Sequence, residues 1–203
     1  ADMQGLIQET QKLKQKGKST SLIWWIPSEF WEMALREDPS LTEDQKVEFV
    51  KALDDYTAFV VVKMDAGILG GMTFKSREDI LKNISLMVGN QEIDPIPIKN
   101  LSPDASSFYT MMKPMMGQML GQFGQGMEFI IYPNKKNGEL IIDPTKKGSF
   151  TYISYGVNND WRLPLGNLMP PVWDPASGEV FPGNYKFNPF TGAKLIVKKE
   201  EKK

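Results

Sequence analysis

The stretch Ala58-Phe-Val-Val-Val-Lys-Met64 opens the part of the chain whose pattern decides the fold. From Tyr56 onward the apolar periodicity changes to two, and turn signals recur at intervals typical of strands. The strands expected from this pattern cover residues 58–64, 71–74, 84–88, 93–98, 127–132, 139–142 and 150–155. Gly89-Asn90 and Asn137-Gly138 supply the positive φ angles that tight hairpins need. The pattern therefore predicts a mainly antiparallel β-sandwich.

Two helices are expected before these strands. Pro27-Ser28, followed by acidic residues, suits a helix start, and this helix should end before Pro39. Thr42-x-x-Gln45 is a capping-box pattern that begins the second helix. The expected fold class is thus α+β, with an N-terminal helical pair joined to the sandwich in one domain over residues 21–163.

The two ends of the chain are polar. Residues 1–20 carry lysine at every second position from Lys12 to Lys18, and we interpret them as a solvated lead-in or a frayed helix. Residues 198–203 are expected to be a solvated end. Ala1-Asp-Met-Gln resembles the residues left after signal-peptide cleavage, which favours export to a bacterial periplasm or cell surface.

The central region resembles the immunoglobulin-like modules of exported bacterial proteins. The resemblance lies in a strand, an acidic insertion at Ser76–Asp79, a strand with a hairpin before Asp94-Pro-Ile-Pro97, and a later strand pair. It implies a fold only, because this fold hosts many functions.

Residues 164–197 contain two copies of the pattern x-Pro-x-x-Gly, Asp174-Pro-Ala-Ser-Gly178 and Asn188-Pro-Phe-Thr-Gly192. The segment resembles a zinc ribbon whose four cysteines are replaced by Asp174, Ser177, Asn188 and Thr191, each pair followed by glycine (Gly178 and Gly192). The resemblance implies a metal-free tail in which the two turns face each other and hydrogen bonds hold them. Two alternatives are open: ordinary turns without this relationship, and a calcium site at Asp174 and Glu179.

This tail is rich in proline and glycine, which excludes a helix. A ribbon this short and without metal lacks a core of its own. We therefore expect the tail to dock on the main domain and to bury Trp173, Phe181, Phe187 and Phe190 there.

Methionine clusters in Met111-Met-Lys-Pro-Met-Met-Gly-Gln-Met119. One interpretation is an inserted amphipathic helix that packs on the sheet through Phe108, Met111 or Met112, Met115, Met119 and Phe123. The alternative is a Cu(I) or Ag(I) site formed by the thioethers of Met111, Met112, Met115, Met116 and Met119. Trp24 and Trp25 are expected either in the core or, with Met115, Met116 and Met119, on a partner-binding surface.

Composition narrows the function classes. The chain has no Cys and no His, which removes thiol nucleophiles, Ser-His-Asp triads and the usual transition-metal sites. Its net charge is −1, so neither nucleic acid nor an anionic membrane is favoured as a partner. No apolar run is long enough to cross a bilayer.

The sequence therefore favours an exported, non-catalytic accessory or assembly module without a cofactor. Its partner would be a protein of the cell envelope or a second copy of the chain. Soft-metal binding is one alternative function. A cell-wall hydrolase that uses paired carboxylates is another, although no pair stands out in the sequence.

Overall fold

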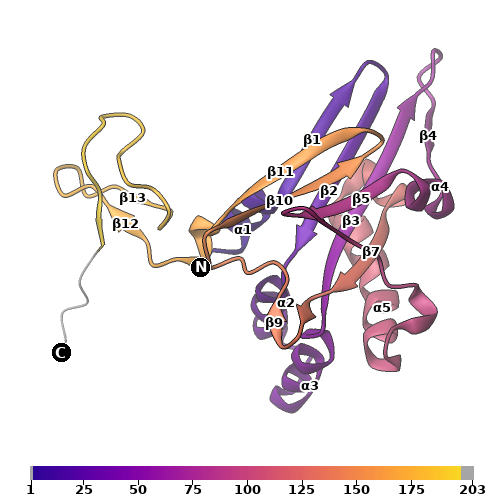
Figure 1. The fold of residues 1–203 in the computed structure, drawn as a ribbon, viewed down its shortest axis with the longest axis horizontal. Helices are drawn as coiled ribbons and strands as arrows, with labels where there is room; N and C mark the ends of the chain where they lie inside the picture. Colours follow the sequence, from indigo (N-terminus) through magenta and orange to yellow (C-terminus); the bar gives the residue numbers. More distant parts are fainter. Residues whose placement is uncertain (1, 198–203) are drawn as a thin grey trace. The chain divides into compact units, whose positions relative to one another are not determined.

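The computed structural model describes residues 2–197, which form mixed helices and antiparallel sheets (Figure 1). The α+β class is therefore confirmed. The described chain divides into two compact units, which we call the main unit (10–142 and 149–161) and the tail unit (2–9, 143–148 and 162–197). The last segment of the tail unit begins at Arg162, and the unit also takes in two earlier segments. The expected solvated end at 198–203 lies outside the described residues.

The larger sheet of the main unit is built around one long strand, β3 (Tyr56–Ala66). β2 (Ser19–Ile26) pairs with one edge of β3, and β1 (Gln11–Lys16) pairs with β2. β4 (Met72–Phe74) and β7 (Glu128–Pro133) both pair with β3, opposite residues 64–66 and 56–61 respectively. All these pairings are antiparallel. Residues 58–62 of β3 are buried without interruption, because both faces of this sheet are covered.

Residues 2–20 are neither a solvated lead-in nor a frayed helix throughout, because a strand follows the first helix. Residues 3–10 form helix α1 (Met3–Thr10), and β1 is the edge strand of a hairpin with β2. The alternating lysines are an edge-strand pattern, since charged side chains protect an exposed sheet edge from further pairing. The Lys12 ammonium lies 5.4 Å from the centre of the Trp161 ring, and Lys14 donates to the carbonyl of Asn158.

Helices cover one face of the larger sheet. They are α2 (Ser28–Arg36), α3 (Glu43–Leu53) and α5 (Pro103–Met119). Trp24 of β2 contacts Phe30 of α2 at a ring-centre distance of 5.3 Å, and Phe129 of β7 contacts Tyr109 of α5 at 5.2 Å. The capping box at Thr42 and Gln45 is present in full, which confirms the expected start of α3.

The opposite face of that sheet carries aromatic contacts to a second sheet with strand order β11-β10-β5-β6. These strands are β5 (Ile84–Val88), β6 (Gln91–Ile93), β10 (Gly148–Ser154) and β11 (Val157–Leu163). Phe59 stacks on Tyr152 with ring centres 4.5 Å apart, and Trp25 meets Phe150 edge-on at 4.8 Å. Consecutive residues of a strand point to opposite faces, so Trp24 and Trp25 anchor the two sides of the same sheet.

Several expected elements differ in the structure. Residues 93–98 are not a strand, because β6 ends at Ile93. Pro95 and Pro97 have no N–H to donate to a neighbouring strand, and the short helix η1 (Ile98–Asn100) follows them. Of 139–142, only β9 (Glu139–Leu140) is a strand, paired with β8 (Lys135–Lys136). The acidic insertion begins helix α4 (Arg77–Lys82), capped by Ser76. The two expected hairpins are confirmed, with positive φ at Gly89, Asn137 and Gly138.

The tail unit contains a small sheet in the order β13-β12-β14. Its strands are β12 (Val172–Trp173), β13 (Val180–Phe181) and β14 (Ile196–Val197), and the short helix η3 (Gly166–Leu168) precedes them. The expectation that this segment has no core of its own is wrong, because Val172, Phe181 and Leu195 form a buried cluster. No helix within residues 2–197 is both long and apolar enough to span a membrane.

Candidate functional site

The methionine-rich segment forms the second half of α5 and exposes three thioethers. The exposed fractions of Met111, Met115 and Met119 are 48%, 52% and 64%. These three residues, which we call the methionine stripe, are spaced by four along one helix. Residues at this spacing neighbour each other on a helix surface. The stripe is therefore a continuous apolar strip available to a ligand.

The side of α5 that packs against the interior of the main unit differs from the expected one. Ala105, Phe108, Tyr109 and Met116 are buried, whereas Met111, Met115 and Met119 are not. Met116 is consequently neither a surface residue nor a thioether available to a metal. The large rings decide the rotation of the helix, because Phe108 meets Trp31 with ring centres 5.0 Å apart and Tyr109 meets Phe129.

Local sequence explains why a helix with an internal Pro114 persists here. The Ser102 hydroxyl accepts the amide of Ala105 at 3.2 Å, and Pro103 occupies the first turn, where its missing N–H costs nothing. Midway along the helix, the Lys113 ammonium pairs with the Glu128 carboxylate of β7 at 2.9 Å. The helix is thus tied to β7 just before its proline, and after the proline Met116 is buried.

Glycines hold the end of α5 against the segment that follows, η2 (Gly121–Gly126). A Cβ built on Gly124 would lie 1.9 Å from the carbonyl oxygen of Gly117, so the two backbones touch there. This close approach leaves a groove of about 580 Å³ lined by Thr110, Lys113, Pro114, Gly117, Gln118, Gly121, Gly124 and Gln125. On the helix, Gln118 of this groove neighbours Met115 of the methionine stripe, three residues earlier.

Trp24 and Trp25 do not belong to any surface. Both side chains are buried, and the indole N–H groups donate to the hydroxyls of Thr10 and Thr57 at 3.1 and 3.0 Å. Of the two interpretations open from the sequence, the core position is the one observed. The partner surface expected from Trp24, Trp25, Met115, Met116 and Met119 therefore reduces to Met115 and Met119, joined by Met111.

In the tail unit, the two x-Pro-x-x-Gly turns lie against each other. The Asn188 side-chain amide donates to the Asp174 carboxylate at 2.7 Å, and both side chains are buried. The backbone follows the same course in each turn. The amide of Gly178 donates to the carbonyl of Asp174, and that of Gly192 to the carbonyl of Asn188, both at 2.8 Å. Gly178 and Gly192 both have positive φ, which explains why glycine ends each turn.

The four oxygen-bearing positions of the turns share one hydrogen-bond pattern. Each side-chain oxygen accepts the backbone N–H two residues later: Ala176 donates to Asp174 at 2.8 Å, Glu179 to Ser177 at 3.3 Å, Phe190 to Asn188 at 2.9 Å and Ala193 to Thr191 at 3.3 Å. The hydrogen bond from Asn188, followed by that from the Ala176 amide, lowers the pKa of Asp174 below its usual range. Asp174 is thus a carboxylate at neutral pH, held by neutral donors.

The amide group of Asn188 occupies the space between two carboxylates. Besides Asp174, its nitrogen lies 3.5 Å from a carboxylate oxygen of Glu179. An amide N–H₂ is a donor, so it meets these oxygens as a cation would. Across residues 2–197, no group of three or more His, Cys, Asp or Glu side chains is placed to hold a metal ion.

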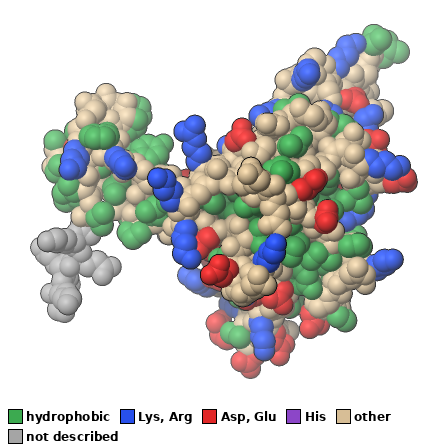
Figure 2. Space-filling model, in the orientation of Figure 1, with side chains coloured by type: hydrophobic (Ala, Val, Ile, Leu, Met, Phe, Trp, Pro, Cys, Tyr) green, Lys and Arg blue, Asp and Glu red, His purple; other side chains and the backbone are tan. Residues whose placement is uncertain are grey.

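Two of the tail's aromatic residues are exposed rather than buried as expected. Phe187 and Phe190 expose 57% and 83% of their surface, whereas Phe181 is buried in the small core. Hydrophobic side chains accordingly reach the surface of the tail unit (Figure 2). The Asn188 side chain accepts the backbone N–H of Phe190 and holds this residue in the turn.

A second groove, of about 660 Å³, lies between α3 and the start of α5 and contains carboxylates. Glu48, Asp55 and Asp104 line it beside Phe49 and Tyr56, and all three acidic residues are exposed. A carboxyl group that donates a proton in glycoside hydrolysis is usually desolvated. This groove therefore does not single out a catalytic pair. Comparison with protein-family models, with curated proteins and with solved structures finds no match for this chain.

Proposed function

We propose that this chain is a non-catalytic protein-binding module, and that the methionine stripe is its main contact surface. The observation that carries the proposal is the exposure of Met111, Met115 and Met119 along one side of a helix that is fixed to the main unit. Methionine is flexible and polarizable, and it is favoured on surfaces that bind apolar partners of varied shape. A partner with an apolar helix or groove fits this strip best.

A protein partner of the cell envelope is part of the same proposal, as is a location outside the cytoplasm. A second copy of the chain is the other partner that the methionine stripe would accept.

We also propose that the tail unit is a metal-free relative of zinc ribbons. The support is the hydrogen-bond pattern shared by Asp174, Ser177, Asn188 and Thr191. Their side-chain oxygens accept hydrogen bonds from backbone N–H groups, and they stand where a zinc ribbon has cysteine thiolates. For the main unit, the ring contacts of Phe59 and Trp25 support the two facing sheets of a sandwich.

The experiment places a photo-cross-linking amino acid at position 115 in the source cells, and in a second strain at Val47. Val47 is an apolar residue of α3 that is also exposed, so it serves as the matched control. We expect one discrete protein adduct from position 115 that position 47 does not give. Equal adducts from both positions, or none from position 115, would contradict the proposal.

Soft-metal binding is the second candidate, because the same spacing brings three thioethers to one side of α5. Calorimetry with Cu(I) under anaerobic conditions separates the two. Replacing Met111, Met115 and Met119 with Leu keeps apolar volume and removes sulfur. A metal site would lose its heat of binding in this variant, whereas a protein-binding strip would keep its partner.

A further inference from the structure

The β3–β4 hairpin ends in an apolar tip. Between Ala66 and Met72 the chain reads Gly67-Ile-Leu-Gly-Gly71, and the Gly67 amide donates to the Gly71 carbonyl at 2.6 Å, which closes the loop. Ile68 and Leu69 project from this loop with exposed fractions of 87% and 100%. Met72, the first residue of β4, is exposed as well. Two adjacent large aliphatic side chains are thus presented to solvent on a closed turn.

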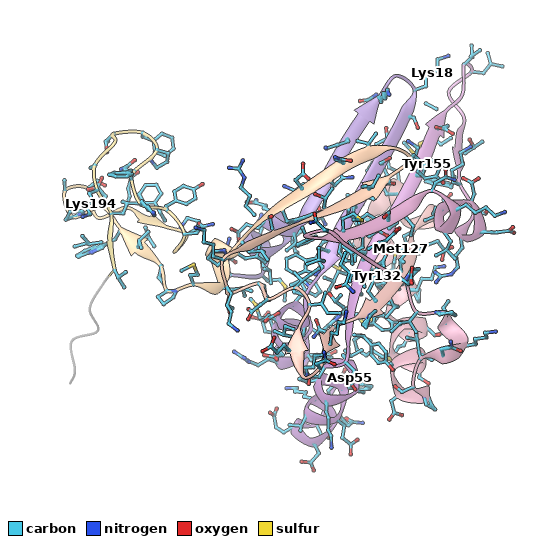
Figure 3. All side chains as sticks on the ribbon, viewed as in Figure 1. Lys18, Asp55, Met127, Tyr132, Tyr155 and Lys194 are labelled. Atoms are coloured by element: carbon cyan, nitrogen blue, oxygen red, sulfur yellow. The ribbon has the colours of Figure 1, made fainter. Side chains whose placement is uncertain are left out.

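Basic residues flank this tip. The turn between β1 and β2, Lys16-Gly17-Lys18, lies at the same end of the sheet, because the Ala66 amide donates to the Lys18 carbonyl at 2.8 Å. Figure 3 shows Lys18 beside the hairpin. Lys16 and Lys18 are exposed, and Lys75 follows β4. Asp65, the acidic residue closest to the tip in the sequence, accepts from the Ser19 hydroxyl at 2.6 Å and faces Lys75 at 3.6 Å.

The local charge thus differs from the net charge of −1 that argues against an anionic partner. Attraction to a charged surface acts over roughly 8 Å in physiological salt, so the charges nearest that surface determine its strength. Aliphatic side chains are stabilised when they enter the interface of a bilayer. Lysines beside them lie at the level of the headgroups and are attracted to anionic lipids. A groove on a protein partner would also bind the two aliphatic side chains. Binding to such a groove does not explain why exposed lysines lie beside them.

We propose that the tip Ile68-Leu69 and the lysines Lys16 and Lys18 form a docking site for an anionic lipid bilayer. The two aliphatic side chains enter the interfacial region and the ammonium groups contact the headgroups. This site lies on the β1–β2 and β3–β4 turns, whereas the methionine stripe lies on α5, so the chain can bind a membrane and a protein at once. It does not depend on the identity of the protein partner.

Flotation with vesicles tests this site in the full chain. Vesicles of phosphatidylcholine and phosphatidylglycerol should carry the protein upward, and vesicles of phosphatidylcholine alone should carry much less. Replacing Ile68 and Leu69 with Ser should weaken binding about tenfold or more, since the apolar contribution is lost. Replacing Lys16 and Lys18 with Glu should weaken binding to the mixed vesicles. Added salt should do the same.

Matched controls use exposed residues elsewhere. Val47→Ser removes an exposed aliphatic side chain, and Lys136→Glu with Lys147→Glu reverses two exposed lysines. Both should bind mixed vesicles as the unmodified chain does. The proposal is overturned if the variant with Ser at positions 68 and 69 floats as well as the unmodified chain. It is also overturned if the unmodified chain does not float. A dimer in sedimentation velocity that forms without vesicles and requires Ile68 and Leu69 overturns it in favour of a second copy.

A second measurement does not depend on how well the serine variant folds. Because the chain has no cysteine, Leu69→Cys gives a single site for an environment-sensitive dye, and Val47→Cys gives its control. The dye at position 69 should shift to the blue on mixed vesicles, and the dye at position 47 should not. Unchanged emission at position 69 contradicts insertion of the tip.

Discussion

At the scale of single residues, Asn188 links the two turns of the tail. Its side-chain oxygen accepts the amides of Phe190 and Thr191 at 2.9 and 3.3 Å, and its nitrogen donates to Asp174. The pattern Asn-Pro-x-x-Gly predicts the bonds within one turn. The contact with Asp174 follows from the two turns facing each other, which their spacing alone does not require.

We expect Asn188→Ala to destabilise the tail unit by about 1–3 kcal/mol, because it leaves the buried Asp174 without its main donor. Urea unfolding followed by NMR of the tail amides measures the change. Ser177→Ala is the control, since Ser177 is exposed and a loss of about 0.5–1.5 kcal/mol or less is expected. Equal losses from the two variants would show that Asn188 has no special role. Addition of a chelator should change the stability of neither variant.

Asp174 also makes the tail sensitive to acid. Its pKa is lowered in the folded chain, chiefly by the Asn188 hydrogen bond, so its contribution to stability is present at neutral pH and above the pKa of the unfolded chain. That contribution is lost as the pH falls below about 4 through the folded pKa. The Ala176 amide and the Asn188 side-chain amide should therefore shift in NMR spectra at acidic pH. In Asp174→Asn, the shift assigned to this titration should vanish; its persistence would assign the titration to another group.

At the scale of elements, the sequence predicts what local chemistry controls. The capping box of Thr42 and the positive φ at Asn137 depend on neighbouring residues, and both are found. β1 was missed because its lysines resemble a solvated segment until β2 is placed beside it. Which side of α5 is buried also depends on residues distant in sequence. Phe108 contacts Trp31 and Tyr109 contacts Phe129, and the pattern of α5 alone does not predict these contacts.

The contact between α5 and η2 gives a prediction about an element. Gly124→Ala would place a methyl group 1.9 Å from the Gly117 carbonyl oxygen, so the backbones must separate. We expect a loss of about 1–3 kcal/mol in the free energy of unfolding. Gly71→Ala is the matched control, because a Cβ there meets no atom within 4 Å. Chemical denaturation measures both, and a Gly124→Ala chain as stable as Gly71→Ala would contradict the close contact.

At the scale of the whole molecule, composition and pattern predict a mixed fold and the approximate start of the tail. They do not predict that residues 2–9 and 143–148 join the tail unit, because this grouping depends on contacts between distant segments. The hydrogen bonds from the Gly166 and Asn167 amides to the Glu9 carboxylate, at 2.7 and 2.9 Å, are of this kind. The candidate site shows the same limit, since the sequence locates the methionine cluster but not which thioethers are exposed.

The central claim is that the methionine stripe binds a protein partner. The most direct test is the dissociation constant for the partner that cross-links at position 115, measured with the purified chain. Replacing Met111, Met115 and Met119 with Gln should weaken binding at least about tenfold, whereas the corresponding Leu variant and Val47→Gln should stay close to the unmodified chain. An unchanged dissociation constant for the Gln variant would contradict the claim.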